Sequence, residues 1–137
     1  MIIRGRRIVE GKAEGEALVS HEPVSFYGGI DPITGMVTEG KHAVEGESVS
    51  GRVFVFPTGK GSTVGSYVIY RMKKLGTAPA AIVNLETEAI LATGCVISGI
   101  PLVDRIGEEA FSLLSSGMRL RVNANQGVVE VLECEDV

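Results

Sequence analysis

A glycine-rich stretch at residues 57–66, PTGKGSTVGS, carries the side chains most able to do chemistry. It separates an apolar, β-branched run from a helical pattern, so we expect a loop between a buried strand and a helix. The start of a helix presents unpaired N–H groups and partial positive charge, and Lys60 adds a full charge. The loop could therefore bind an anion or favour the deprotonated form of a hydroxyl. The candidate binding residues are Gly59, Lys60, Gly61 and Thr63, and the candidate catalytic residue is Ser62.

Three interpretations of this loop remain open on the residues alone. Ser62 could simply cap the helix, because serine is a common N-cap residue. The loop could bind a phosphate or nucleotide, although a Walker A motif needs Ser or Thr directly after Gly-Lys, and Gly61 intervenes here. Glycines at 59, 61 and 65 give only a weak dinucleotide pattern. In the third interpretation, Ser62 is a catalytic hydroxyl.

A serine that accepts a proton needs strong electrostatic help. A helix N-terminus contributes up to about 2 kcal/mol, and a lysine about 4 Å away contributes at most about 4 kcal/mol at an effective dielectric of about 20. Together they lower a pKa by roughly four units, which is too little to ionise serine at neutral pH. Neither His21 nor His42 falls in a hydrolase motif that could assist. The sequence therefore suggests half of a site.

Composition limits the class of protein. The chain has 137 residues, 45% hydrophobic and 22% charged, which is typical of one globular domain spanning residues 1–137. A net charge of -4 argues against general nucleic-acid binding. No stretch approaches the roughly 20 apolar residues of a membrane span. The first residues lack the pattern of a signal peptide, so we expect a cytoplasmic protein.

Two isolated cysteines cannot build a metal or cluster site by themselves. Cys95 and Cys134 are 39 residues apart, and neither histidine stands at ligand spacing from them. Cys95 opens an apolar run and is expected to be a buried core thiol. A metal cofactor would have to be supplied by another chain.

The first half of the chain is expected to be rich in strands. Residues 2–9 and 16–19 are strand candidates, divided by Gly11 and Gly15. Residues 26–35 contain Gly-Gly and Asp-Pro and predict an irregular loop. Residues 52–56 predict a buried strand that ends at Pro57.

The second half is expected to alternate helices and strands. A helix capped by Ser62 or Thr63 should run to Leu75 and stop at Gly76, with Val64, Val68, Met72 and Leu75 along its apolar face and Tyr67 beside them. Strands are expected at 80–83, 95–98, 118–122 and 128–132, a brief extended piece at 101–103, and helices at 86–93 and 108–116. The turn between the last two strands is expected at Gln126-Gly127. These elements predict an α+β domain with layered β/β/α architecture.

Several motifs together resemble a known family. They are GGIDPITG at residues 28–35, His42, GRVFVFPTGKGSTVGS at residues 51–66 and APAAIV at residues 78–83. In this order they resemble the small, swivel-domain subunits of the aconitase X family, and as a separate short chain most closely the archaeal ones. The chain departs from the family pattern at Ala43, where a proline is expected after His42.

The resemblance implies a fold, an activity and a partner. The fold is a swivelling β/β/α domain, and the partner is a large subunit that holds a [4Fe–4S] cluster, forming a heterodimer. The implied reaction dehydrates (R)-5-phosphomevalonate to trans-anhydromevalonate 5-phosphate in an archaeal mevalonate pathway. In that pattern the cluster iron binds the leaving hydroxyl, and a serine alkoxide, carried onto Ser62 here, removes the proton. Another hydroxy acid, such as hydroxyproline, remains an alternative substrate.

Other polar residues have a structural interpretation beside a functional one. Asp31 and Thr34 could face a substrate, but Asp-Pro segments are usually turns. Asn84 ends a strand near the loop, and Asp104 follows another strand as a turn or cap candidate. The cluster of Arg4, Arg6 and Arg7 could meet an acidic partner or simply be solvated.

Overall fold

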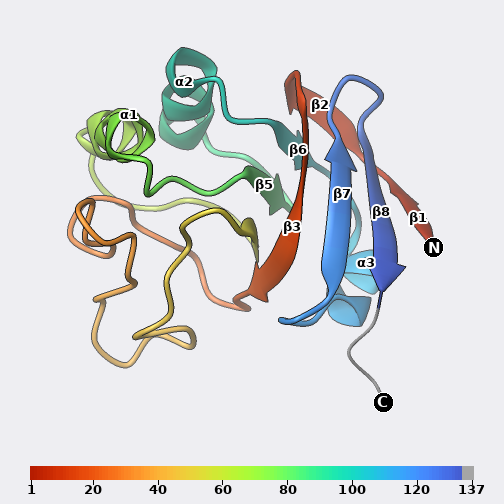
Figure 1. Ribbon diagram of the computed structural model, residues 1–137, viewed down its shortest axis with the longest axis horizontal. Helices are drawn as coiled ribbons and strands as arrows, with labels where there is room; N and C mark the ends of the chain where they lie inside the picture. Colours follow the sequence, from red (N-terminus) through yellow and green to blue (C-terminus); the bar gives the residue numbers. More distant parts are fainter. Residues whose placement is uncertain (134–137) are drawn as a thin grey trace.

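The computed structural model describes residues 1–133, and Cys134 lies outside the described residues. Eight strands and three helices follow one another along the chain (Figure 1). They are β1 (Ile2–Arg4), β2 (Arg6–Val9), β3 (Lys12–Val19), β4 (Val53–Phe56), α1 (Gly65–Leu75), β5 (Ala81–Asn84), α2 (Ala89–Ser98), β6 (Leu102–Asp104), α3 (Glu108–Leu113), β7 (Arg119–Asn123) and β8 (Val128–Glu133). The β4 and β5 strands, the Gly76 stop and the hairpin between β7 and β8 confirm the corresponding predictions.

Strand β3 connects two layers of sheet. Residues 12–16 pair antiparallel with β7, which continues through β8 to β1. Residues 17–19 pair in parallel with β4, which continues through β5 and β6 to the antiparallel edge strand β2. We call these the antiparallel layer and the parallel layer. Helices α1 and α2 form a third layer, which gives the layered β/β/α architecture expected from the sequence (Figure 1).

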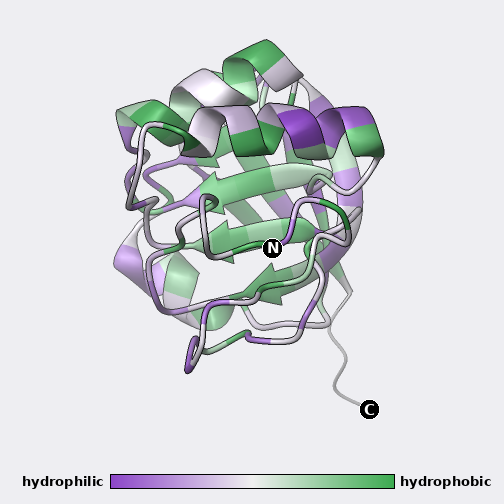
Figure 2. Cartoon of the chain, turned by 90° about the vertical axis from the view of Figure 1, so that its left-hand side faces the viewer, coloured by the Kyte–Doolittle hydropathy of each residue, from purple (hydrophilic) through white to green (hydrophobic). Residues whose placement is uncertain are grey.

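The parallel layer is buried on both faces, which explains its continuous apolar runs. Alternate side chains point to opposite faces of a strand, so each run supplies two cores. Figure 2 shows the hydrophobic strands of this layer beneath the two helices. The side chains facing the helical core include Leu18, Phe54, Phe56, Ile82 and Leu102. Those facing the antiparallel layer and α3 include Ala17, Val53, Val55, Val83 and Val103.

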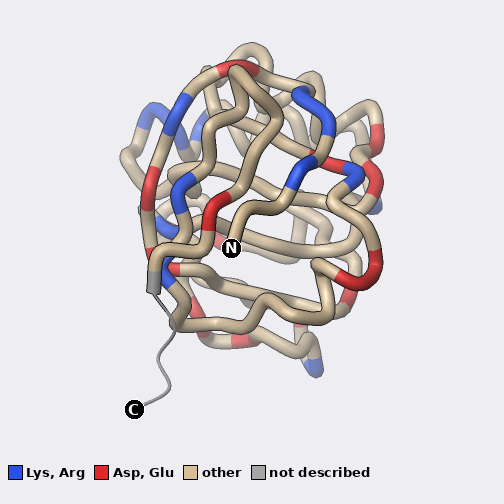
Figure 3. The backbone as a smooth tube through the Cα atoms, turned by 90° about the vertical axis from the view of Figure 1, so that its right-hand side faces the viewer, with Lys and Arg blue, Asp and Glu red and all other residues tan. Residues whose placement is uncertain are grey.

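The outer face of the antiparallel layer is polar and internally paired. Glu14 lies 2.9 Å from Arg119 and 3.3 Å from Arg121, and Arg121 lies 3.5 Å from Glu130. Figure 3 shows positive and negative residues interspersed on this side of the molecule. Such exposed pairs each contribute at most about 1 kcal/mol, but they balance charges of the central strands β3, β7 and β8 of this layer.

Helix α2 corrects two predictions. We expected a helix at 86–93 stopped by Gly94 and a strand at 95–98, but one helix runs from Ala89 to Ser98 and ends at Gly99, whose φ is 68°. Gly94 lies inside it because α1 packs there. A Cβ on Gly94 would lie 2.8 Å from Cδ1 of Ile69 and 3.1 Å from Cα of Ser66. The glycine therefore marks a close helix–helix contact and not a helix end.

Two other element boundaries differ from the prediction for identifiable reasons. Gly15 does not divide a strand but lies within β3, where a Cβ would approach the carbonyl oxygen of Gly51 to 3.0 Å. Helix α3 stops at Leu113 and not at Ser116. The Ser116 hydroxyl instead accepts a hydrogen bond from the backbone N–H of Val19, 2.9 Å away.

The buried face of α1 also differs from the expected one. Gly65, Ile69 and Met72 are buried, whereas Val64 and Leu75 are 41% and 51% exposed. The helix begins at Gly65, later than expected. Gly65 and Ile69 take the buried positions that were expected for Val64 and Val68, while Met72 is buried as expected. Within the described residues, no helix is long and apolar enough to cross a membrane.

Candidate active site

The loop between β4 and α1 is held by backbone pairing to a distant segment. The N–H of Lys60 donates to the carbonyl of Val24 at 2.9 Å, and the N–H of Val24 donates to the carbonyl of Thr58 at 3.1 Å. Val24 belongs to the irregular segment at residues 20–52, which also places Phe26 against Phe54 and Phe56. The loop is therefore anchored to the helical core through this segment.

Both candidate binding glycines in the loop lie where a side chain would collide. A Cβ on Gly59 would lie 3.0 Å from the Glu88 carboxylate, and a Cβ on Gly61 would lie 2.5 Å from the Ser25 hydroxyl oxygen. Gly61 also has a φ of 100°, which favours glycine. These glycines let the loop pass closely over α2 and over residue 25, so the structure gives them a clear role in shaping the loop.

Ser62 caps the turn that leads into α1, as one interpretation predicted, although the assigned helix begins three residues later. The N-cap of α1 is Val64, which makes no side-chain capping bond, and the helix begins at Gly65. The Ser62 Oγ accepts a hydrogen bond from the N–H of Val64 at 3.1 Å, and its carbonyl accepts one from Gly65 at 2.9 Å. Ser62 is exposed, and the first turn of α1 has no acidic residue. Its oxygen thus lies at the positive end of the helix, within reach of a partner.

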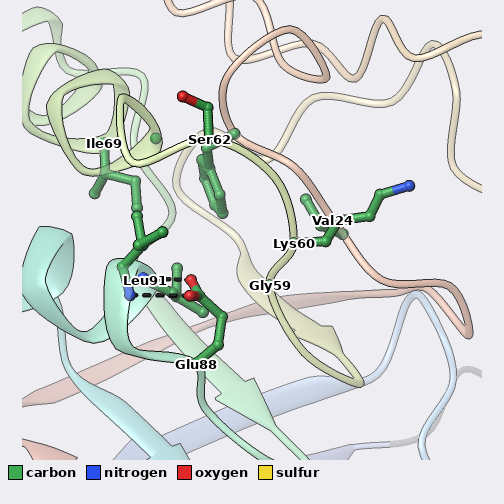
Figure 4. A pocket seen from close by; sticks show the side chains of 10 residues that line it. Val24, Gly59, Lys60, Ser62, Ile69, Glu88 and Leu91 are labelled. Carbon is green, nitrogen blue, oxygen red and sulfur yellow. Dashed lines mark hydrogen bonds between the residues drawn. The ribbon is translucent and has the colours of Figure 1, made fainter.

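Lys60 does not lie over the serine. Its ammonium group forms an ion pair with Glu39 at 3.1 Å, and Figure 4 shows the lysine and Ser62 side chains pointing in different directions. The lysine contribution to an alkoxide is therefore smaller than the upper limit estimated for a charge about 4 Å away. Helix α1 and Lys60 together are therefore not sufficient to ionise a serine hydroxyl at neutral pH. Thr63 is exposed next to Ser62.

A small cavity lies under the loop, and Ser62 points away from its floor. Its volume is about 10 Å³, with Phe26, Gly59, Ile69, Glu88 and Leu91 among its lining residues. That is room for about one water and not for a metabolite. Glu88 closes one side and caps α2 by accepting hydrogen bonds from the N–H groups of Ile90 and Leu91 (Figure 4). Any ligand larger than a water that contacts the Ser62 oxygen would therefore lie on the outer side of the loop.

Asp31 and Thr34 are used within their own turn. The Asp31 carboxylate accepts from the N–H of Ile33 at 2.9 Å, and the Thr34 hydroxyl accepts from the N–H of Met36 at 3.2 Å. These short-range bonds fit the turn interpretation of the Asp-Pro segment.

His42 is buried and joins two parts of the irregular segment. Its Nδ1 accepts from the N–H of Val44 at 3.3 Å, and its Nε2 lies 3.1 Å from the carbonyl oxygen of Pro23. This pattern assigns the proton to Nε2, which then donates to Pro23. The histidine therefore has a structural role in supporting the segment that carries Val24.

Asn84 and Asp104 hold the ends of neighbouring strands. Asn84 is buried and donates to the carbonyl of Phe56 at 3.0 Å. Asp104 is fully buried and binds Arg6 through two bonds of 2.9 and 2.8 Å, while the N–H of Thr87 donates to it at 2.9 Å. Burial alone would raise the pKa of Asp104, but these bonds outweigh it and hold the pKa below its ordinary value.

The described residues do not form a site for a metal cluster. Within residues 1–133, no group of three or more His, Cys, Asp or Glu side chains could hold a metal ion. Cys95 is a buried core thiol, as expected, and burial raises its pKa to about 12. A protonated, buried thiol is a poor metal ligand.

Sequence reasoning missed three residues that shape this loop: Ser25, Glu39 and Glu88. Ser25 and Glu39 are distant along the chain and carry no local signal. Glu88 precedes an apolar run, a position that could have suggested a helix cap. The late start of α2 followed from that cap.

Comparisons with known proteins converge on one family. The family model described as the aconitase X swivel domain matches residues 2–131. The phosphomevalonate dehydratase small subunit of Thermococcus onnurineus is 56% identical over 133 residues, covering 97% of this chain and 100% of the relative. That of Methanosarcina mazei is 53% identical over 130 residues, covering 95% and 90%. A crystal structure of Thermococcus kodakaraensis aconitase X in its holo-form superimposes with a TM-score of 0.93 at 53% identity, covering 97% of this chain and 99% of that one.

Proposed function

The chain belongs to the aconitase X swivel-domain family, and from this premise we propose that it is the small subunit of a phosphomevalonate dehydratase. The observation that carries this proposal is the match over nearly the whole length of both chains to relatives named as that subunit. A small subunit implies a larger one. We further propose that residues 1–137 form one swivel domain, that the two subunits form a heterodimer, and that this enzyme dehydrates (R)-5-phosphomevalonate to trans-anhydromevalonate 5-phosphate.

Ser62 is proposed as the proton acceptor in this reaction. Its exposed oxygen lies at the N-terminal end of α1 and already accepts one backbone N–H, so negative charge there is favoured. The alkoxide takes the proton from the carbon next to the one that bears the hydroxyl. The electrons of that C–H bond form the double bond as the hydroxyl departs, and the product gains its unsaturation without any redox change.

Gly59, Lys60, Gly61 and Thr63 are proposed to bind the substrate around Ser62. The glycines bring the backbone of the loop to the surface, and Thr63 supplies a neighbouring hydroxyl. The Lys60 side chain is half exposed, so its ammonium group can exchange the Glu39 carboxylate for the substrate phosphate. The cavity beneath the loop is too small for a metabolite, which supports a substrate bound between the outer surface of the loop and the larger subunit.

The iron–sulfur cluster of such an enzyme is proposed to lie on the larger subunit as a [4Fe–4S] centre. This placement is supported by the donor set of the described residues, which does not fit a cluster. The part assigned to this chain is thus limited to substrate binding and proton transfer. The cytoplasmic location expected from the sequence stays a prediction.

The test is anaerobic reconstitution with the larger subunit, followed by an assay of dehydration. Ser62→Ala is expected to lower kcat by about 10²–10⁴-fold, the range for a positioned acid or base. Ser66→Ala is the matched control, since Ser66 lies one turn away and donates only to the carbonyl of Thr63. Equal turnover by wild type and Ser62→Ala would reject Ser62 as the base. Faster turnover of hydroxyproline than of phosphomevalonate would reject the substrate.

A further inference from the structure

All three tyrosines of the chain are exposed near α1. Tyr27, Tyr67 and Tyr70 are 55%, 70% and 41% exposed. Tyr27 belongs to the segment that flanks the helix: a Cβ on Gly65 would lie 3.9 Å from the backbone nitrogen of Tyr27. Aromatic side chains with so much exposed surface are enriched where proteins bind one another. The same side of the molecule carries α1 across its width (Figure 2).

The same helix carries a concentration of positive charge. Residues 48–85 include five Lys or Arg residues and no Asp or Glu, although the chain as a whole has a net charge of -4. Three of the five, Arg71, Lys73 and Lys74, lie in the second half of α1 and are exposed. The helix dipole favours the two cations in the last turn, Lys73 and Lys74. It does not explain the presence of Arg71 or the lack of Asp and Glu between residues 48 and 85.

Arg71, Lys73 and Lys74 belong to the exposed cations without a carboxylate partner in the described residues, together with Arg4, Arg7, Lys12 and Lys41, and other cations are paired. Arg52, Lys60, Arg105, Arg119 and Arg121 each have a carboxylate within 4.0 Å. Within residues 1–133, Arg71, Lys73 and Lys74 have no such partner, and Lys74 instead lies 5.4 Å from the ring centre of Tyr70. The positive charge on α1 is therefore left unbalanced, in contrast to the charges of Arg119 and Arg121 on the antiparallel layer, which are paired with Glu14 and Glu130.

Four of these residues form one stripe along the helix. Positions 67, 70, 71 and 74 follow the spacing i, i+3, i+4 and i+7, which places them on one face, opposite the buried Gly65, Ile69 and Met72. We define the tyrosine–cation face as Tyr67, Tyr70, Arg71 and Lys74. It begins beside the loop of Ser62, because Tyr67 is only five residues further along the chain.

We propose that the tyrosine–cation face docks on an acidic surface of the larger subunit. This inference rests on the proposed function. The exposed tyrosines supply contact area, and the unpaired cations are complementary to a surface of opposite charge. A second copy of this chain does not fit, since two such faces would bring like charges together. The position beside Ser62 fits the larger subunit, because any chain that completes the site must come close to this loop.

The experiment measures the affinity of the reconstituted complex by titration calorimetry at low and moderate salt. Arg71→Glu with Lys74→Glu is expected to raise Kd at least about tenfold, and Tyr67→Ala at least about fivefold. The affinity of wild type is expected to fall as salt rises, because exposed charges are screened. The kcat at saturating small subunit is expected to change less than twofold, since none of these residues touches Ser62.

The matched control is Arg4→Glu with Lys12→Glu. Both residues are exposed cations of the antiparallel layer without an ion pair in the described residues, and this double variant changes the net charge by the same amount. Its Kd is expected to stay within about twofold of wild type. Equal weakening by both double variants would show a nonspecific charge effect and overturn the inference.

A measurement on the unmodified chain removes any dependence on variant folding. Amide hydrogen exchange across residues 62–75 is expected to slow when the larger subunit is added. Unchanged exchange there, or wild-type affinity of Arg71→Glu with Lys74→Glu, would overturn the docking face while leaving the dehydratase assignment intact. The absence of any complex with wild type would overturn both. Tight binding of single-stranded RNA that the α1 variant abolishes, with unchanged subunit affinity, would assign the face to a different ligand.

Discussion

The ammonium group of Lys60 lies 3.1 Å from the Glu39 carboxylate, and this ion pair draws the lysine away from Ser62. The two residues are 21 positions apart, on two different loops. The pair therefore couples the candidate catalytic loop to the irregular segment around His42. Because of this pair, the ammonium group of Lys60 points away from the Ser62 hydroxyl.

Lys60→Met is expected to raise KM for the phosphorylated substrate at least about tenfold, because a charge-assisted bond to phosphate is lost. Glu39→Gln is expected to leave KM equal or lower, since the lysine no longer has a competing carboxylate. Steady-state kinetics of the reconstituted enzyme measures both. An unchanged KM for Lys60→Met would exclude Lys60 as a substrate ligand. The pair is half exposed, so Glu39→Gln should cost at most about 1 kcal/mol of stability.

Gly61→Ala is expected to displace the catalytic loop. The substitution adds a methyl group 2.5 Å from the Ser25 hydroxyl and places alanine at a φ of 100°, so we expect a loss of about 1–3 kcal/mol in stability and a lower kcat. Gly46→Ala is the control, because Gly46 has a φ of 87° and open space around it. Adding Ser25→Ala to Gly61→Ala should restore part of kcat. No recovery in the double variant would mean that the backbone conformation alone, and not the contact, limits activity.

Asp104→Asn is expected to make the stability of the protein less dependent on acid pH. The pKa of Asp104 lies below its ordinary value of 3.8 in the folded state, so its stabilising effect is complete above that value and is lost as pH falls through the folded pKa. The variant should lose about 1–3 kcal/mol at pH 7, the range for hydrogen bonds to a charged group. Urea unfolding between pH 2 and pH 7 would show the two curves converging toward low pH. A gap that stays constant across this range would contradict the ion-pair explanation.

Gly94→Ala is expected to destabilise the protein although alanine favours helices. Alanine gains about 1 kcal/mol in helix propensity, but its methyl group would meet Ile69 and the backbone of Ser66, and overpacking costs about 1–3 kcal/mol. Thermal unfolding should show a lower Tm for Gly94→Ala. Thr93→Ala, at the adjacent exposed position, should leave Tm equal or higher. A higher Tm for Gly94→Ala would show that α1 can shift without cost.

Much of the fold followed from local patterns in the sequence. The β4 run VFVF, the turn at Gly127 and the helix stop at Gly76 are local signals, and each was predicted correctly. The family was recognised from ordered motifs, and the comparisons confirm it. The layered β/β/α architecture was also predicted and is confirmed by the solved relatives.

The errors arose where contacts distant in sequence decide the local structure. Gly94 has the local pattern of a helix stop, but it lies inside α2 because α1 packs against it. Gly15 has the pattern of a strand break, but it lies inside β3 because the backbone of Gly51 passes close to it. The same reason limits the site prediction. The loop residues were found from their own pattern, whereas the Glu39 partner of Lys60 and the Ser25 contact of Gly61 depend on how a long irregular segment folds back. The roles assigned to Ser62 and its neighbours stay predictions.

The pairing of β1 with β8 has a practical consequence for reagents. These strands form the edge of the antiparallel layer, and the N–H of Val131 donates to the carbonyl of Met1 at 2.9 Å. Figure 1 shows the N-terminus on the side remote from α1. A biotin tether or a fluorescent label attached at Met1 would therefore lie on the side of the molecule opposite α1. The surface around Ser62 would stay open to an incoming protein in solution.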